Sequence, residues 1–115
     1  MSVRLGPRLE LIRLPRRPER GDYDWFDLEQ DGTPVGKARC RIEPGQFTVF
    51  SIMVYPEYEG NGYARAVVGH LQGRYGLIVA DRVRYTARDF WTKVGFTAET
   101  IDRYVWRKTT RPGPP

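Results

Sequence analysis

The chain changes its hydrophobic period within one short stretch, and that change restricts the folds it can adopt. Residues 47–55, FTVFSIMVY, are apolar at nearly every position, as in a strand buried inside a sheet. Residues 56–63, PEYEGNGY, carry a proline and two glycines and predict a loop. A helical spacing follows, with apolar side chains at Ala64, Val67, Val68 and Leu71. A buried strand, a glycine loop and an amphipathic helix in succession favour an α/β fold.

The rest of the chain divides into strands and one further helix. Residues 8–14 predict a short strand, and the apolar residues on both sides of Asp31–Gly32 predict a hairpin over residues 23–42. Pro44–Gly45 predicts a type II turn before the strand 47–55, which we expect to be covered on both faces. Residues 77–81 predict a short buried strand, and residues 97–101 and 103–108 predict two closing strands.

A second helix is predicted over residues 86–96. Thr86 is the expected N-cap, Ala87, Phe90, Trp91 and Val94 form the apolar stripe, and Gly95 is the expected C-terminal stop. Together the elements predict an α/β protein with a mixed, mostly antiparallel central sheet flanked by helices. At 115 residues, the chain is long enough for one domain, expected over residues 1–108. Residues 109–115 are rich in proline and glycine and predict a disordered tail.

Several classes of protein are excluded by composition. No apolar run approaches the roughly 20 residues that span a bilayer, and the amino terminus does not resemble a signal peptide. Cys40 is the only cysteine and His70 the only histidine, so we expect neither an internal disulfide nor a metal site built by this chain alone. Cys40 shares a strand face with Ala38 and Ile42 and is expected in the core. These features favour a cytoplasmic protein.

Positive charge gathers at the amino terminus. Residues 1–20 hold six arginines against Glu10 and Glu19, whereas the whole chain has a net charge of +5. A basic arm of this kind can bind nucleic acid or an acidic partner. No aromatic residues interleave with the arginines, so a solubilising end is the favoured interpretation and nucleic-acid binding is not expected.

The loop before the first helix predicts an anion site. A helix that starts behind glycines leaves its first N–H groups without intrahelical partners, and its dipole favours negative charge. The N–H donors that would line such a site belong to Gly60, Asn61, Gly62, Tyr63 and Ala64, with Arg65 as an added charge. The alternative is a structural turn that needs left-handed backbone at Gly60 or Gly62. The loop is not a nucleotide P-loop, because no Gly-Lys-Ser/Thr follows.

Two motifs in order resemble the GNAT superfamily of acyl-CoA-dependent N-acetyltransferases. The first is a strand that ends in V-x-P-x-x before a Q/R-x-x-G-x-G/A loop, which reads here as Glu59-x-x-Gly62-x-Ala64. The second is an A-x-x-F-Y/W-x-K-x-G-F helix, which reads here from Ala87 to Phe96. The resemblance implies a GNAT-like sheet with a splayed centre. The usual two helices after the first strand are missing, because only Pro15 to Asp22 join those segments.

The resemblance also implies a function. Loop amides of the family bind the diphosphate of coenzyme A, and main-chain groups of the preceding strand, here Ile52, Met53 and Val54, hold its pantetheine arm. Phe90 and Trp91 would line the thiol end. The implied reaction is transfer of an acetyl group from acetyl-CoA to a primary amine of a small molecule or a protein, by direct attack. The missing helices imply an open acceptor side, a large acceptor, or a pocket completed by a second subunit, so a homodimer is possible.

The chain departs from the family pattern at its charged and catalytic positions. Glu59 replaces glutamine or arginine, and its carboxylate repels a diphosphate unless it points to solvent. Trp91 replaces a tyrosine that protonates the leaving thiolate, which leaves Tyr85 as the candidate donor. The carboxylates nearest in sequence, and therefore the candidate bases, are those of Glu43, Glu57 and Asp81.

None of the candidate bases is supported by the sequence alone. Each of the three carboxylates is expected to be a solvated surface group, and His70 is expected on the helix surface. A water relay, or an acceptor that is already neutral, is the alternative route for the proton. A non-catalytic module of the same fold that binds acyl-CoA or a partner is therefore the alternative to an enzyme.

Overall fold

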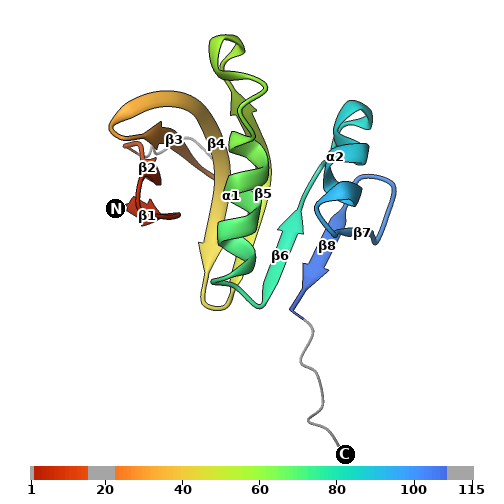
Figure 1. Ribbon diagram of the computed structural model, residues 1–115. Coiled ribbons are helices and arrows are strands. Elements are labelled where there is room, and N and C mark those ends of the chain that lie inside the picture. Colours follow the sequence, from red (N-terminus) through yellow and green to blue (C-terminus); the bar gives the residue numbers. More distant parts are fainter. Residues whose placement is uncertain (1, 16–22, 109–115) are drawn as a thin grey trace, which may run out of the picture.

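One mixed sheet organises the part of the chain that the computed structural model describes, residues 2–15 and 23–108. It has eight strands in the order β1-β2-β3-β4-β5-β6-β8-β7, and β5–β6 is its one parallel pair among these residues (Figure 1). The strands are β1 (Ser2–Arg4), β2 (Leu9–Arg13), β3 (Asp24–Gln30), β4 (Thr33–Glu43), β5 (Gln46–Val54), β6 (Leu77–Ala80), β7 (Thr97–Ala98) and β8 (Tyr104–Arg107). The helices are α1 (Tyr63–Gln72) and α2 (Arg88–Lys93), each preceded by a 3-10 turn, η1 (Pro56–Tyr58) and η2 (Tyr85–Ala87). The predicted α/β class is confirmed.

The two turns of the antiparallel half follow their local sequence. Asp31 and Gly32 have φ values of 51° and 80° between β3 and β4, which is the paired positive φ of a type I′ hairpin turn. Gly45 has φ 74° between β4 and β5, where a type II turn requires a positive value. The strand predicted over residues 8–14 is confirmed as β2, and the closing strands are confirmed as β7 and β8. The predicted tail, residues 109–115, lies outside the described residues.

Strand β1 was not predicted. It has only three residues, which is too few for a period-two pattern to stand out. It pairs antiparallel with β2, and the Leu5 N–H donates to the Leu9 carbonyl to close the turn between them. Val3 and Leu5 are buried, so the amino-terminal segment belongs to the sheet and to its core.

Helix α1 begins one residue before the predicted start, at Tyr63. Its buried face consists of Val67, Val68 and Leu71, as the spacing predicted. Gly73 is its C-cap, and the Gly73 N–H donates to the His70 carbonyl at 3.2 Å.

The prediction for the start of the second helix is wrong. Thr86 is not an N-cap: it lies in the 3-10 turn η2, and α2 begins at Arg88 with Ala87 as N-cap and no side-chain cap bond. The Ala87 N–H donates to the Arg84 carbonyl, and this three-residue spacing closes a 3-10 turn instead of the first α turn. Gly95 ends the helical segment with φ 98°, as predicted.

Both helices pack on the same face of the sheet. The Gln72 side chain at the end of α1 donates to the Val94 carbonyl at the end of α2, at 2.8 Å. Phe47, Thr48 and Val49 are buried, but Met53 is 51% exposed further along the strand. The expectation that β5 is covered on both faces is therefore confirmed only for the first half of the strand. The second face is consequently open at the carboxyl end of β5.

Cys40 is buried on the helix-covered face, as predicted. Burial raises the pKa of its thiol well above the ordinary range, so this sulfur stays protonated and packs as a small apolar group.

Within residues 2–15 and 23–108, neither helix has the length and apolar content that crossing a bilayer requires.

Candidate functional site

Strands β5 and β6 pair at one end and separate at the other. Their parallel register runs from Gln46–Leu77 to Val49–Ala80, and the Asp81 N–H donates to the Val49 carbonyl at 2.8 Å to close the ladder. Beyond this point β5 continues to Val54 against β4 alone, and the two strands diverge toward the top of Figure 1. The splayed centre implied by the resemblance is confirmed.

A β-bulge accounts for the separation. Arg39 of β4 faces Ser51, and the next residue, Cys40, faces Val49, so Phe50 is an extra residue in β5. A bulge of this kind bends its strand and increases the local twist. The bend falls at the residue where β5 leaves β6.

The free edge of β5 presents main-chain groups to the opening. The Tyr55 N–H donates to the Val35 carbonyl of β4 at 2.9 Å, so by alternation the main-chain groups of Ile52 and Val54 point away from β4. Met53 is different: its carbonyl oxygen lies against Gly36, where an added Cβ would clash with it. Of the three predicted main-chain ligands, Ile52 and Val54 therefore face the opening, and Met53 pairs with β4.

The loop between β5 and α1 has the backbone that its glycines predicted. Gly60 has φ 83°, and Gly62, the N-cap of α1, has φ 77°. The Asn61 side chain donates to the Tyr58 carbonyl at 2.9 Å and holds the loop closed on itself. An added Cβ at either glycine would meet no atom within 4 Å, so open space adjoins both positions.

The start of α1 offers unpaired N–H donors. The first intrahelical bond runs from the Ala66 N–H to the Gly62 carbonyl at 2.9 Å, so Tyr63, Ala64 and Arg65 have no intrahelical acceptor. In the described part of the chain, no other acceptor takes these N–H groups. Arg65 is exposed in the first turn. Glu59 is also exposed, which leaves the donors accessible to an anion.

The amino-terminal turn forms a wall beside this loop. A pocket of about 220 Å³ lies between residues 6–9 and the start of α1, and Asn61, Gly62 and Tyr63 contribute to its lining. Gly6 permits the close approach, because an added Cβ would lie 2.8 Å from the His70 ring. His70 is exposed on α1, as expected.

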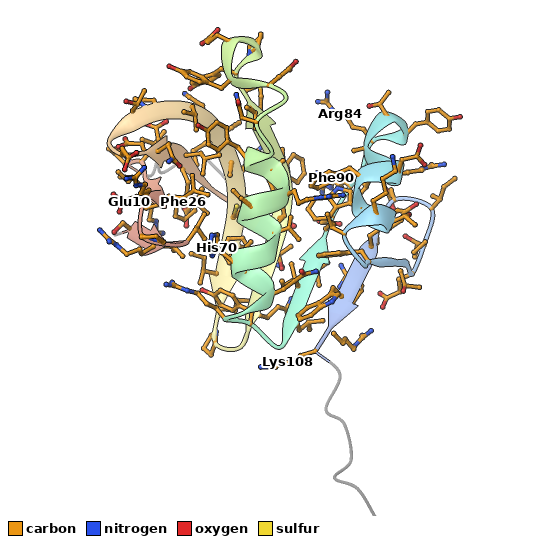
Figure 2. All side chains as sticks on the ribbon, in the orientation of Figure 1. Glu10, Phe26, His70, Arg84, Phe90 and Lys108 are labelled. Carbon is orange, nitrogen blue, oxygen red and sulfur yellow. The ribbon has the colours of Figure 1, made fainter. Side chains whose placement is uncertain are left out.

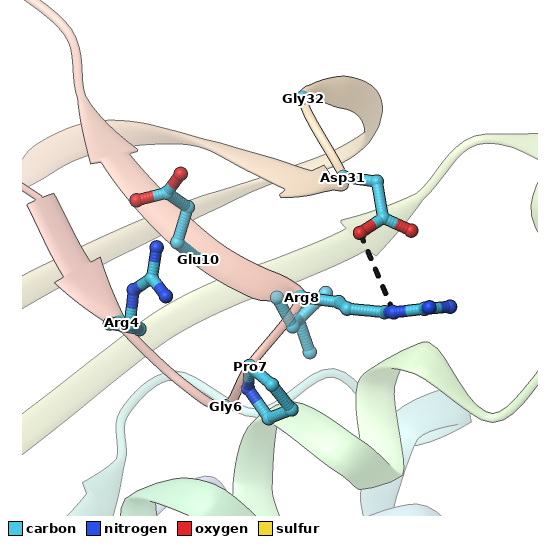
Figure 3. Close-up of a pocket in the computed structure, with 8 residues that line it drawn as sticks. Arg4, Gly6, Pro7, Arg8, Glu10, Asp31 and Gly32 are labelled. Atoms are coloured by element: carbon cyan, nitrogen blue, oxygen red, sulfur yellow. Dashed lines mark ion pairs between the residues drawn. The ribbon is translucent and has the colours of Figure 1, made fainter.

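An adjoining pocket of about 250 Å³ carries balanced charge. Figure 3 shows it between β1, β2 and the hairpin turn, with Arg4 and Glu10 on one side and the Arg8–Asp31 ion pair, 3.8 Å long, on the other. Two arginines and two carboxylates offset each other in this pocket, so its charge does not select an anion. Arg13 of the same segment pairs with Asp24 at 2.6 Å. The basic arm is thus partly neutralised where it is described, and Arg16, Arg17 and Arg20 lie outside the described residues.

The predicted residues of α2 differ in accessibility. Phe90 is half-buried, and Figure 2 shows it, with Arg84, on the side of α2 that faces α1. Trp91 is buried between the rings of Phe90 and Phe96, with centroid distances of 5.1 and 4.9 Å. Tyr85 is 80% exposed, and the Arg88 guanidinium lies over its ring at 5.1 Å. The structure therefore directs Phe90 toward the opening, and keeps Trp91 in the core and Tyr85 at the surface.

A tyrosine–aspartate pair marks the base of the opening, and sequence reasoning missed it. The Tyr23 hydroxyl donates to Asp81 at 2.6 Å, and the Tyr23 ring contacts Phe50 with a centroid distance of 5.1 Å. Asp81 is half-buried, so the expectation that it is a solvated surface group is wrong, whereas Glu43 and Glu57 are exposed as expected. The two partners are 58 residues apart, and no local pattern links them.

Burial, and then the bond to Asp81, raise the pKa of Tyr23 to about 12. The folded state therefore keeps this proton between pH 10 and about 12, where an unfolded tyrosine loses it. The resulting stability is complete below pH 10 and is lost as the pH rises to about 12. We expect the stability advantage of the parent over Tyr23→Phe to shrink across this range in urea unfolding curves. A constant advantage would show that the hydroxyl is not held as the structure indicates.

This combination of a splayed sheet and a glycine loop has known relatives. The chain belongs to the GNAT acetyltransferase family, because the family model described as an acetyltransferase (GNAT) domain matches residues 21–98. An uncharacterized N-acetyltransferase of Bacillus licheniformis is 30% identical over 87 residues, which are 67% of this chain and 54% of that protein. Another, of Shouchella clausii, is 32% identical over 107 residues, 80% of this chain and 56% of that protein. The chain thus spans about half the length of these curated relatives.

Solved structures share the fold. The Escherichia coli protein YhhK, whose solution structure holds coenzyme A, matches with a TM-score of 0.65 at 12% identity, over 88% of this chain and 99% of that one. A Thermus thermophilus acetyltransferase matches with a TM-score of 0.61 at 16% identity, over 78% of this chain and 67% of that one. At these identities the likeness concerns the fold alone.

Proposed function

We propose that the chain transfers an acetyl group from acetyl-CoA to a primary amine. The observation that carries the proposal is the free edge of β5 opening directly beside the unpaired N–H groups at the start of α1. Family membership supports the same activity, and YhhK, which has the same fold, holds coenzyme A in its structure. In this proposal the N–H groups from Gly60 to Arg65 bind the diphosphate. The main-chain groups of Ile52 and Val54 hold the amides of the pantetheine arm as a neighbouring strand would, and Phe90 contacts its thiol end.

The reaction needs a group that takes a proton. A lysine-like amine has a pKa near 10.4 and is mostly protonated at neutral pH. We assign the proton to the Asp81 carboxylate, which lies at the base of the opening and is oriented by the Tyr23 hydroxyl. The neutral nitrogen then forms its bond to the acyl carbon as the carbon–sulfur bond breaks, and the leaving thiolate is protonated by solvent. Tyr85 as a proton donor stays a prediction, because its side chain is at the surface.

The rival function is an acyl-CoA-binding module without turnover. Burial of Trp91 and exposure of Tyr85 favour it, because neither side chain brings an acid to the thiol end. Three further predictions from the sequence also belong to the proposal: a cytoplasmic location, no binding of nucleic acid, and a homodimer as one way to complete the acceptor pocket. Light scattering measures the oligomeric state.

Calorimetry and thiol release together test the proposal. We expect coenzyme A to bind in isothermal titration, and acetyl-CoA to release free thiol only when a primary amine is added. Mass spectrometry should then find the amine heavier by one acetyl group. Binding without thiol release across a broad amine panel favours the rival function. Absence of binding overturns both readings of the site.

A further inference from the structure

An arginine–aromatic cluster covers the helix-free face at the base of the opening. It consists of Trp25, Arg39, Phe50 and Arg82. The Arg39 guanidinium carbon lies 5.4 Å from the Trp25 ring centroid and 4.9 Å from that of Phe50, and the Arg82 guanidinium carbon lies 5.4 Å from the Phe50 centroid. Trp25 is 40% exposed, so solvent reaches the cluster.

The two guanidinium groups of the cluster have no carboxylate partner in the described part of the chain. Arg41 on the same strand pairs with Glu43 at 2.8 Å, but among the described residues neither Arg39 nor Arg82 forms an ion pair. Arg39 Nε is buried without a hydrogen-bond partner. Stacking on rings holds a guanidinium by its faces and leaves its terminal N–H groups, which lie in the plane, available to an anion.

Arg82 has a backbone that its side chain does not favour. Its φ is 53°, in the left-handed region, and unlike Asp31 it is not part of a hairpin turn. A side chain other than that of glycine, asparagine or aspartate rarely adopts this conformation, and such outliers concentrate at binding sites. Arg82 immediately follows Asp81 in the sequence, and its positive φ places the side chain over the ring of Phe50, the bulge residue.

The position of the cluster relates it to the reaction. Phe50 is the residue at which β5 leaves β6, and Asp81 closes the ladder between them. The cluster therefore borders the site at which an acyl group held along β5 would meet its acceptor, on the face where the described residues form no helix. The acceptor amine and its remaining groups would approach from this side.

We propose that the acceptor is a small primary amine that carries a carboxylate, and that Arg39 and Arg82 bind this carboxylate. The inference rests on the proposed acetyltransferase function and adds the class of acceptor to it. The Nε of Arg39 is buried, so its two terminal nitrogens are the donors that remain accessible. A planar carboxylate can accept from both nitrogens of such a fork at once. With its carboxylate on these arginines, the acceptor can direct its amine toward Asp81 and the acyl carbon.

Matched acids and amides test the acceptor class. We expect γ-aminobutyrate or ε-aminocaproate to exceed its own amide in kcat/KM by about tenfold or more in thiol release from acetyl-CoA. In Arg39→Gln and Arg82→Gln the ratio of kcat/KM for the acid to kcat/KM for the amide should fall close to one, with the affinity for coenzyme A unchanged. Arg74→Gln, at an exposed arginine beyond α1, should keep the parent preference. Arg82→Gly should also lose the preference while keeping or raising thermal stability, because glycine adopts positive φ without strain.

A binding measurement separates this inference from the proposed function. The Trp25 indole N–H signal in NMR should shift with γ-aminobutyrate and not with γ-aminobutyramide, with or without coenzyme A and with or without turnover. A chain that binds the acid at Trp25 but releases no thiol contradicts the proposed function and keeps the carboxylate site. Equal kcat/KM for acid and amide, or a preference that survives in both glutamine variants, overturns the carboxylate proposal. Preference for an aminoalkyl phosphate over both acids overturns it as well.

Discussion

Gly62→Glu should abolish binding of coenzyme A and leave the fold in place. The new carboxylate would stand among the N–H donors at the start of α1 and repel a diphosphate there. At a separation of about 4 Å and an effective dielectric constant of about 20, one pair of like charges costs about 4 kcal/mol. Since each 1.4 kcal/mol is about a tenfold change in Kd, we expect a loss of more than about a hundredfold. The side chain has room, because an added Cβ at Gly62 meets no atom within 4 Å.

Two control variants separate the charge from the backbone effect. Gly62→Ala carries the strain of a side chain at φ 77°, on the order of 1–2 kcal/mol, without a charge. Gly69→Glu places the same charge on α1, where an added Cβ also meets open space, but away from the loop. Isothermal titration should show affinity close to that of the parent for both controls, with circular dichroism confirming the fold of all three. If Gly62→Glu binds coenzyme A as tightly as the parent, the diphosphate does not lie at this helix.

Asp81→Asn should lower kcat/KM for acetyl transfer by about a hundredfold to ten-thousandfold, the usual range for removal of a general base. The amide has nearly the same shape, and its oxygen can still accept the Tyr23 hydroxyl bond, so the pair stays together. What it loses is the ability to take a proton from the acceptor ammonium. The difference in kcat/KM between Asp81→Asn and the parent should become smaller at high pH, where more of the acceptor amine is already neutral.

Initial rates across pH, measured by thiol release, provide the test. The matched control is Asp31→Asn, since asparagine before glycine also suits the hairpin turn and the change removes the same charge. It should retain the parent rate, and both variants should bind coenzyme A normally. A full rate in Asp81→Asn would assign proton transfer to water or to another group.

Local structure was predictable where a short stretch of chain decides it. Asp31–Gly32 and Pro44–Gly45 specify their turns because few residues other than glycine tolerate the required φ, and α1 follows from the period of its apolar residues. The start of α2 was predicted wrongly, because Thr86 has the chemistry of an N-cap and nothing nearby reveals the 3-10 turn. Burial of Cys40 was predictable from the alternation of charged and apolar residues along β4.

The candidate site was only partly predictable, because its halves come from distant parts of the chain. The loop donors are local, and the glycines indicated them directly. Asp81 meets Tyr23 only after β6 and the β3–β4 hairpin have joined the same sheet, and Arg39 meets Phe50 only because of a bulge. The helix-free face likewise follows from where α2 packs, which the periodicity of its own sequence does not determine.

The four residue pairs between β5 and β6, Gln46–Leu77 to Val49–Ala80, are a short seam between the two parts of the sheet. A linear ligand whose amide groups pair with the free edge of β5 would lengthen this pairing. It would then be a structural component of the sheet as well as a reactant. Such a ligand binds the native chain and not the unfolded one, so the free energy of unfolding increases with the logarithm of the ligand concentration above its Kd. The stability of the folded domain would then depend on the cellular concentration of its own acyl donor.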